Sequence, residues 1–130
     1  IDGLRAHNIR CSAAYDIEPQ RQDIEQRDAL APWSFRPPGT LFITNPPWAR
    51  TILHPLIESL TRAGSAWLLF DADWMHTRQA APYLPYCNTI VSVGRVKWIV
   101  DSPNTGKDNA AWYLFTPQQR IDPTQFHGRT

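Results

Sequence analysis

The sequence predicts an α/β protein with a mostly parallel sheet, because strand-like apolar runs alternate with a helix-like segment along the chain. Residues 41–44 and 65–70 are short apolar runs bounded by turn residues, as is typical of buried strands. Between them, residues 50–63 carry apolar side chains at the spacing of one helical face. Residues 89–100 and 110–115 predict two final strands without an intervening helix, and hence an antiparallel C-terminal edge hairpin.

The segment before this core predicts a helix end and two shorter strands. Residues 2–8 have the pattern of the last turns of a helix, residues 9–15 that of a strand, and residues 23–26 that of a second, short strand. Residues 31–39 contain three prolines and a glycine, which predicts a loop.

Several details of the later elements also follow from single residues. His54-Pro55 suggests that the regular helix starts at Pro55, and Gly94 suggests a bulge or bend in its strand. A second helix is expected over residues 73–81, ending before a proline. We expect one domain over residues 1–116 and a polar, flexible tail over residues 117–130, which contains two prolines and a glycine.

Composition excludes several classes of function. A formal net charge of +1 gives no overall nucleic-acid signature and favours few phosphate contacts. The two cysteines and the four histidines have no metal-ligand spacing, so we expect free thiols and no metal site. No segment resembles a signal peptide or a membrane span, which predicts a cytoplasmic protein with no membrane partner.

The most informative residues are Asn45-Pro46-Pro47-Trp48, directly after the strand over residues 41–44. Each proline fixes its own φ, lacks an N–H, and forces the residue before it into an extended conformation. The turn is therefore stiff and offers two acceptors, the Asn45 side-chain oxygen and the Pro46 carbonyl, beside an aromatic ring. Such a site suits a planar guest that carries an amino group. A strand-end turn with a surface tryptophan is the alternative.

This arrangement resembles motif IV of the class I S-adenosylmethionine-dependent amino methyltransferases, most closely the adenine-N6 methyltransferases of DNA. The resemblance implies a Rossmann-like methyltransferase sheet, S-adenosyl-L-methionine as cofactor and DNA as partner. It also implies that Asn45 and Pro46 accept the two hydrogens of the adenine N6 amine, which orients the nitrogen toward the methyl group. Trp48 would stack on a base flipped out of its duplex.

The resemblance also implies cofactor-binding acids. Asp16 follows the strand over residues 9–15, which corresponds to the second strand of the family fold. It matches the acid that binds the ribose there, with Glu18 as a near alternative. Asp28 resembles the acid that accepts from the adenine amine of the cofactor, although Ala29 stands where the family often has an aromatic residue. Both acids also fit ordinary turn positions.

The family's first motif, a strand with a glycine-rich turn before a helix, has no counterpart here, since Gly3 is the only early glycine. We therefore expect an N-terminally truncated methyltransferase that lacks the first strand. Its cofactor site would be incomplete, and this segment alone would be inactive.

Residues at other strand ends are candidates for substrate binding. Asp71 and Trp74 follow the strand over residues 65–70 and could border the base pocket, or Asp71 could cap the next helix. Lys97, Trp98 and Lys107 resemble a basic, aromatic stretch in the family's final hairpin and could meet phosphates or wall the pocket. A solvated edge hairpin explains the charges nearly as well.

Three functions remain open from the sequence. The leading one is methylation of the adenine N6 amine in DNA, held by Asn45, Pro46 and Trp48. The same chemistry could serve RNA adenine or guanine, or a protein glutamine, although Trp48 favours a large aromatic guest. A non-catalytic nucleic-acid-binding remnant is the third. No target-recognition domain is evident, so the target sequence is not predicted.

Overall fold

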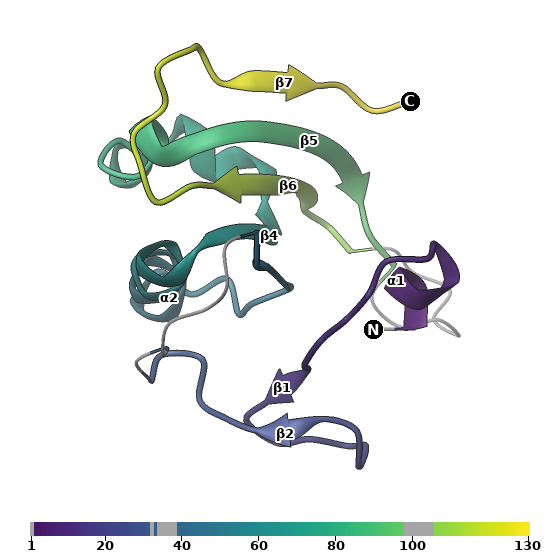
Figure 1. The fold of residues 1–130 in the computed structure, drawn as a ribbon. Helices are drawn as coiled ribbons and strands as arrows, with labels where there is room; N and C mark the ends of the chain where they lie inside the picture. The colour runs from purple at the N-terminus through teal and green to yellow at the C-terminus, as the bar shows by residue number, and fades with distance from the viewer. Residues whose placement is uncertain (1, 32, 34–38, 98–105) are drawn as a thin grey trace. The chain divides into compact units, whose positions relative to one another are not determined.

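A computed structural model gives the fold, and it describes residues 2–31, 33, 39–97 and 106–130 (Figure 1). The chain divides into two compact units, Ile1–Pro32 and Trp33–Thr130. The first unit holds a sheet of two strands and the second a sheet of five.

The first unit contains helix α1 (Asp2–Ala6) and two parallel strands, β1 (Tyr15–Asp16) and β2 (Glu25–Gln26). The predicted strand over residues 9–15 is wrong except at its last residue. Its only strand partner in the described part of the chain is the two-residue β2, so most of the segment has nothing to pair with. Ile9 is accordingly 48% exposed, which leaves the segment without the apolar burial that stabilises a strand.

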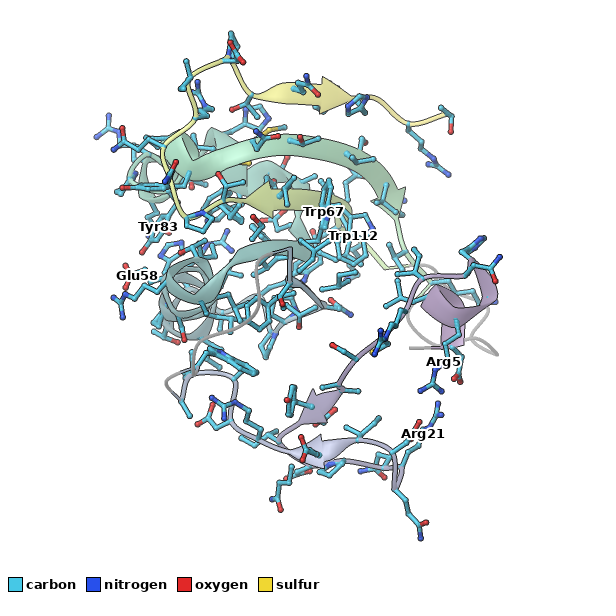
Figure 2. The ribbon with its side chains drawn as sticks, viewed as in Figure 1. Arg5, Arg21, Glu58, Trp67, Tyr83 and Trp112 are labelled. Carbon is cyan, nitrogen blue, oxygen red and sulfur yellow. The ribbon has the colours of Figure 1, made fainter. Side chains whose placement is uncertain are left out.

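Surface ion pairs connect α1 to the turn before β2. Arg21 contacts Asp2 at 2.8 Å and Asp23 at 2.9 Å. Arg5 lies 3.7 Å from Asp23, and Figure 2 shows Arg5 and Arg21 on facing segments. Because all of these side chains are well exposed, water and salt screen the pairs and each adds little stability.

The second unit is built on one mixed sheet with the strand order β3-β4-β6-β5-β7. The strands are β3 (Leu41–Thr44), β4 (Ser65–Asp71), β5 (Cys87–Arg95), β6 (Asn109–Phe115) and β7 (Gln125–His127). The β3–β4 and β5–β7 pairs are parallel, and β6 is antiparallel to both of its neighbours. Within this sheet only β6 is reversed, as the opposed arrows of β5 and β6 show in Figure 1.

The predicted α/β class with a mostly parallel sheet is confirmed, but two details of its C-terminal part are wrong. The β5–β6 hairpin is antiparallel as predicted, yet it does not form the edge, because β7 pairs with β5 on the outside. The expected flexible tail after residue 116 therefore contains a strand. The Thr124 hydroxyl donates to the Cys87 carbonyl at 2.8 Å and helps to hold this strand in place.

Helix α2 (Arg50–Ala63) covers one face of the sheet. Its apolar stripe is fully buried against alternate residues of β4 and β6, and the stripe consists of Leu53, Leu56, Ile57 and Leu60. The helix starts at Arg50, earlier than the predicted start at Pro55. Pro55 lies in the second turn of this helix. Its missing N–H costs the helix one hydrogen bond, the bond to the carbonyl of exposed Thr51, and the helix tolerates this loss.

The second predicted helix, over residues 73–81, is replaced by short 3₁₀ turns. These are η1 (Ala72–His76), η2 (Arg78–Ala80) and a third turn, η3 (Leu84–Tyr86). Thr77 lies between the first two with an extended backbone (φ −86°, ψ 153°), which interrupts the helical hydrogen bonding. The segment is nevertheless held to the core, since Trp74 and Ala80 are fully buried.

The predicted irregularity at Gly94 is confirmed. The pairing register between β5 and β6 shifts between Ser92 and Gly94, and Gly94 has a φ of 87°. That value lies in the left-handed region, which residues with a Cβ atom rarely adopt. The strand ends at Arg95, whereas residues 98–100 of the predicted strand lie outside the described residues.

The other face of the sheet is apolar but only partly buried. Trp67 and Trp112 point to this face from β4 and β6 and lie together in Figure 2. Leu41 and Ile43 of the edge strand β3 extend the same face and are 45% and 40% exposed. Among the described helices, none is long and apolar enough to cross a membrane.

Candidate active site

The Asn45–Trp48 turn connects the carboxyl end of β3 to the start of α2. Asn45 is exposed, Pro46 is buried, and Trp48 is half-buried and packs against the hydrophobic core. Within the described ranges, no hydrogen bond satisfies the side-chain amide of Asn45. The Asn45 oxygen is therefore available to a ligand. The other end of the turn, at Trp48, packs against the hydrophobic core.

The backbone of this turn adds a second acceptor. Neither proline carries an N–H, and no donor to the Pro46 carbonyl is found in the described part of the chain. The first backbone carbonyl to enter the helix is that of Ala49, which accepts from Leu53 at 2.8 Å. The acceptors at Asn45 and Pro46 thus precede the helix, and neither accepts a hydrogen bond from its backbone.

The strand registers bring several candidate residues to the same end of the five-stranded sheet. Strands β3 and β4 run in parallel, so Asn45 and Asp71 both follow the carboxyl ends of these strands. Asp71 is paired with Ala110 at the start of β6, and Arg95 with Asn109. In open α/β sheets, ligands bind at this end.

The structure gives Asp71 a structural role. Its Oδ1 accepts from the backbone N–H of Asp73 at 3.0 Å and caps η1, which confirms the capping alternative. Its Oδ2 lies 3.4 Å from Nη2 of Arg50, which forms an ion pair. Both carboxylate oxygens of Asp71 are thus engaged within the chain, and its contact with substrate stays a prediction.

The prediction that Trp74 borders a base pocket is wrong. Trp74 is 0% exposed and lies in the core, with its ring edge-on to Phe70 and Tyr113 at centroid distances of 5.1 and 5.3 Å. Its Nε1 donates to Nε2 of His54 at 3.0 Å. The tight 3₁₀ turn after Asp71 directs this large side chain into the core, where burial of its ring stabilises the fold.

The predicted basic residues Lys97 and Lys107 lie two residues after the end of β5 and two residues before the start of β6. Lys97 and Lys107 are both exposed, and each is one residue away from the hydrogen bond between the Gly106 N–H and the Val96 carbonyl (2.9 Å). This bond brings the two lysines to the same part of the hairpin. Trp98 lies outside the described residues.

The predicted cofactor acids belong to the first unit. Asp16 ends β1, and Asp28 follows β2 by two residues, so both lie at the carboxyl ends of adjacent parallel strands. One oxygen of Asp16 accepts from the N–H of exposed Glu18 at 2.9 Å, and one oxygen of Asp28 accepts from Leu30 N–H at 2.9 Å. Each carboxylate thus has a local turn bond and a second oxygen to which no described residue donates. These oxygens could accept hydrogen bonds from hydroxyl or amino groups of a ligand.

Sequence reasoning missed three residues of the second unit. Arg50 contacts both the Asn45–Trp48 turn and Asp71, and it could have been noticed as a cation in the first turn of a helix that has no acid there. The rings of His54 and Tyr83 are in contact, with their centroids 4.6 Å apart and their planes tilted by 30°. The Tyr83 hydroxyl donates to Glu58 at 3.2 Å (Figure 2). No sequence signal pairs these two rings.

The electrostatics of this cluster follow from burial. Burial, aided by the positive charge of Arg50, lowers the pKa of His54 below its usual 6.5. Burial and the neighbouring Glu58 raise the pKa of Tyr83. Both groups are therefore held neutral near pH 7, which is consistent with His54 accepting a hydrogen bond from Trp74.

No group of three or more potential metal ligands occurs among the described residues, and Cys11 and Cys87 are free. No protein-family model and no curated protein sequence matches the chain. The solved structures that it resembles include the crystal structure of the 23S rRNA methyltransferase ErmE, at a TM-score of 0.47 and 17% identity. The alignment covers 86% of this chain and 53% of that chain, so the chain spans about half the length of that protein.

Proposed function

We propose that the Asn45–Trp48 turn binds the exocyclic amine of adenine in nucleic acid, as part of an S-adenosylmethionine-dependent adenine-N6 methyltransferase. The observation that carries the proposal is the pair of acceptors at Asn45 and Pro46, to which no described residue donates. They lie next to the half-buried ring of Trp48, at the ligand-binding end of the sheet.

Each part of the turn has a chemical task. The Asn45 side-chain oxygen accepts one amine hydrogen, and the Pro46 carbonyl accepts the other. The nitrogen lone pair, otherwise delocalised into the ring, is thereby localised on the nitrogen and directed at the methyl group. These two acceptors also stabilise the positive charge that develops on the nitrogen during methyl transfer. Pro47 holds the turn in one conformation, which lowers the entropic cost of orienting the base. Trp48 offers an aromatic face for stacking.

The first unit carries the acids that would bind the cofactor. Asp16, with Glu18 beside it, would accept from the ribose hydroxyls, and Asp28 from the adenine amine. When bound, S-adenosylmethionine supplies an electrophilic methyl group. Asp16 and Asp28 support the assignment because they follow adjacent parallel strands, and because each has a carboxylate oxygen to which no residue in the described ranges donates.

DNA is the leading substrate, because the Asn-Pro-Pro-Trp sequence resembles most closely the motif of the DNA-directed enzymes. Exposed Lys97 and Lys107 would contact phosphates. The formal net charge of +1 favours few such contacts and therefore a weak dependence of binding on salt.

The decisive experiment identifies the methylated nucleoside. The full-length protein is incubated with S-adenosylmethionine that carries a trideuterated methyl group, and with DNA or RNA in separate reactions. Mass spectrometry of the digested nucleosides should find labelled N6-methyldeoxyadenosine in the DNA. Label in the RNA alone would transfer the proposal to RNA, and label only in cytosine, in guanine or in protein would refute the adenine assignment.

A further inference from the structure

Arg50 connects the acceptor turn to the neighbouring strand end. Its Nη1 donates to the carbonyl of Trp48 at 3.1 Å, and its Nη2 pairs with Oδ2 of Asp71 at 3.4 Å. The two side chains are only 30% and 23% exposed, so this pair is better shielded from water than the ion pairs elsewhere on the described surface. One guanidinium group thus contacts both the end of the turn and the end of β4.

The Asp71 end of this connection is itself fixed. Its Oδ1 accepts from Asp73 N–H at 3.0 Å, and its backbone carbonyl accepts from the Tyr113 hydroxyl at 2.9 Å. Tyr113 is fully buried in the core. Arg50 is therefore held by an acid that cannot move without disturbing η1 and β6.

The position of Arg50 is unfavourable for the helix alone. It is the first residue of α2, where the helix dipole favours acidic side chains, and no acid occupies the first turn. The N-cap residue, Ala49, forms no side-chain capping bond. Neither Ala49 nor Arg50 is a residue that stabilises the start of a helix. This indicates that Arg50 stabilises the turn before the helix and not the helix itself.

We propose that Arg50 is a positioning residue, which with Asp71 holds the Asn45–Trp48 turn in the geometry that receives the adenine amine. This inference rests on the proposed function. Strand β3 fixes the turn at Asn45, and the bond from Arg50 fixes it at the Trp48 carbonyl. The two prolines between these points leave little freedom, so both acceptors are aimed before the base arrives.

The test compares variants of the full-length protein in the nucleic-acid methylation assay. Arg50→Met removes both contacts and keeps the aliphatic stem, Arg50→Lys keeps the charge, and Asp71→Asn keeps a capping oxygen but loses the ion pair. Arg62→Met is the matched control, because Arg62 lies on the same helix, is 79% exposed, and forms a 3.9 Å ion pair with Glu58 as its one contact of this kind among the described residues.

Arg50→Met should lower kcat by roughly ten- to a hundredfold, since a misplaced reactive group costs rates of this order. Arg50→Lys should recover part of the loss, and affinity for S-adenosylmethionine should not change. Adding Asp71→Asn to Arg50→Met should cause no further loss, because the two residues act as one unit. A normal kcat in Arg50→Met, a loss equal to that in Arg62→Met, or additive losses would overturn the proposal.

A second readout needs no activity and separates this inference from the proposed function. In protein labelled with 5-fluorotryptophan, the fluorine resonance of Trp48 is assigned by its loss in Trp48→Phe. It should shift or broaden in Arg50→Met and in Asp71→Asn, but not in Arg62→Met; an unchanged resonance would overturn the positioning role. A wild-type protein that methylates no nucleobase would refute the proposed function, and the fluorine spectra would still decide whether Arg50 holds the turn.

Discussion

Trp74 donates a hydrogen bond from its indole Nε1 to Nε2 of His54 across 3.0 Å, and this bond joins η1 to helix α2. The geometry requires that Nε2 of His54 carry no proton. Trp74 is fully buried, so its N–H has no access to water if His54 withdraws. A buried donor without a partner costs about 1–3 kcal/mol, which makes the protonation state of His54 part of the fold.

Stability should therefore fall as the pH is lowered past the usual pKa of histidine. Burial and Arg50 lower the pKa of His54 in the folded protein below 6.5, so the unfolded chain takes up a proton at a higher pH than the folded chain does. The contribution of His54 to the free energy of unfolding is complete above pH 6.5 and declines as the pH drops from there toward the folded-state pKa. Chemical denaturation at pH 8 and at pH 5.5 measures it.

The variant His54→Gln isolates this effect. Its amide oxygen can still accept from Trp74 but does not titrate, so the loss between pH 8 and pH 5.5 should be smaller than in the wild type. Identical pH profiles for wild type and His54→Gln would show that His54 does not titrate as described.

Gly94→Ala should destabilise the protein by about 1–2 kcal/mol, the usual cost of placing a Cβ atom in the left-handed region. Gly94 has a φ of 87°, and a Cβ atom there would lie 2.7 Å from the Arg129 guanidinium. Gly128→Ala is the control, because the nearest atom to its Cβ would be in the ring of Phe126, at an ordinary 3.9 Å. Equal midpoints of urea unfolding for the two variants would contradict the bulge geometry.

The two cysteines should react very differently with iodoacetamide in the native protein. Cys87 is fully buried, and burial raises its pKa to about 12, so almost no reactive thiolate is present near pH 8. Cys11 is only partly buried. Mass spectrometry should find Cys11 alkylated first and Cys87 only after denaturant is added. Rapid native alkylation of Cys87 would mean that β5 opens readily at its start.

The sequence predicted the elements that carry a strong apolar signal, either a continuous apolar run or apolar side chains at helical spacing. Strand β3, helix α2 and strand β4 lie close to their expected positions, because apolar spacing determines which face of each element is buried. Strand β7 was missed because all three of its residues are exposed, so it has no apolar pattern and depends on its pairing with β5.

In the candidate site, too, the sequence predicted local geometry but not contacts between distant elements. The conformational restriction at Pro46 and Pro47 is local, so the form of the turn could be predicted from the sequence. The burial of Trp74 could not, because it depends on Phe70, Tyr113 and His54, which come from three other elements. The pair between Arg50 and Asp71 likewise joins residues 21 positions apart, and only the parallel register of β3 and β4 brings them together.

The central claim is that Asn45 holds the amine that is methylated, and a single substitution tests it most directly. Asn45→Ala in the full-length protein removes one acceptor from an exposed side chain, so folding and the affinity for S-adenosylmethionine should be unchanged. Methylation of adenine N6 should fall by about a hundredfold or more, as is usual when a group that stabilises the transition state is lost. Asn88→Ala, at an exposed position in β5, should retain full activity. Wild-type methylation by Asn45→Ala, or a loss of cofactor affinity in its place, would contradict the account.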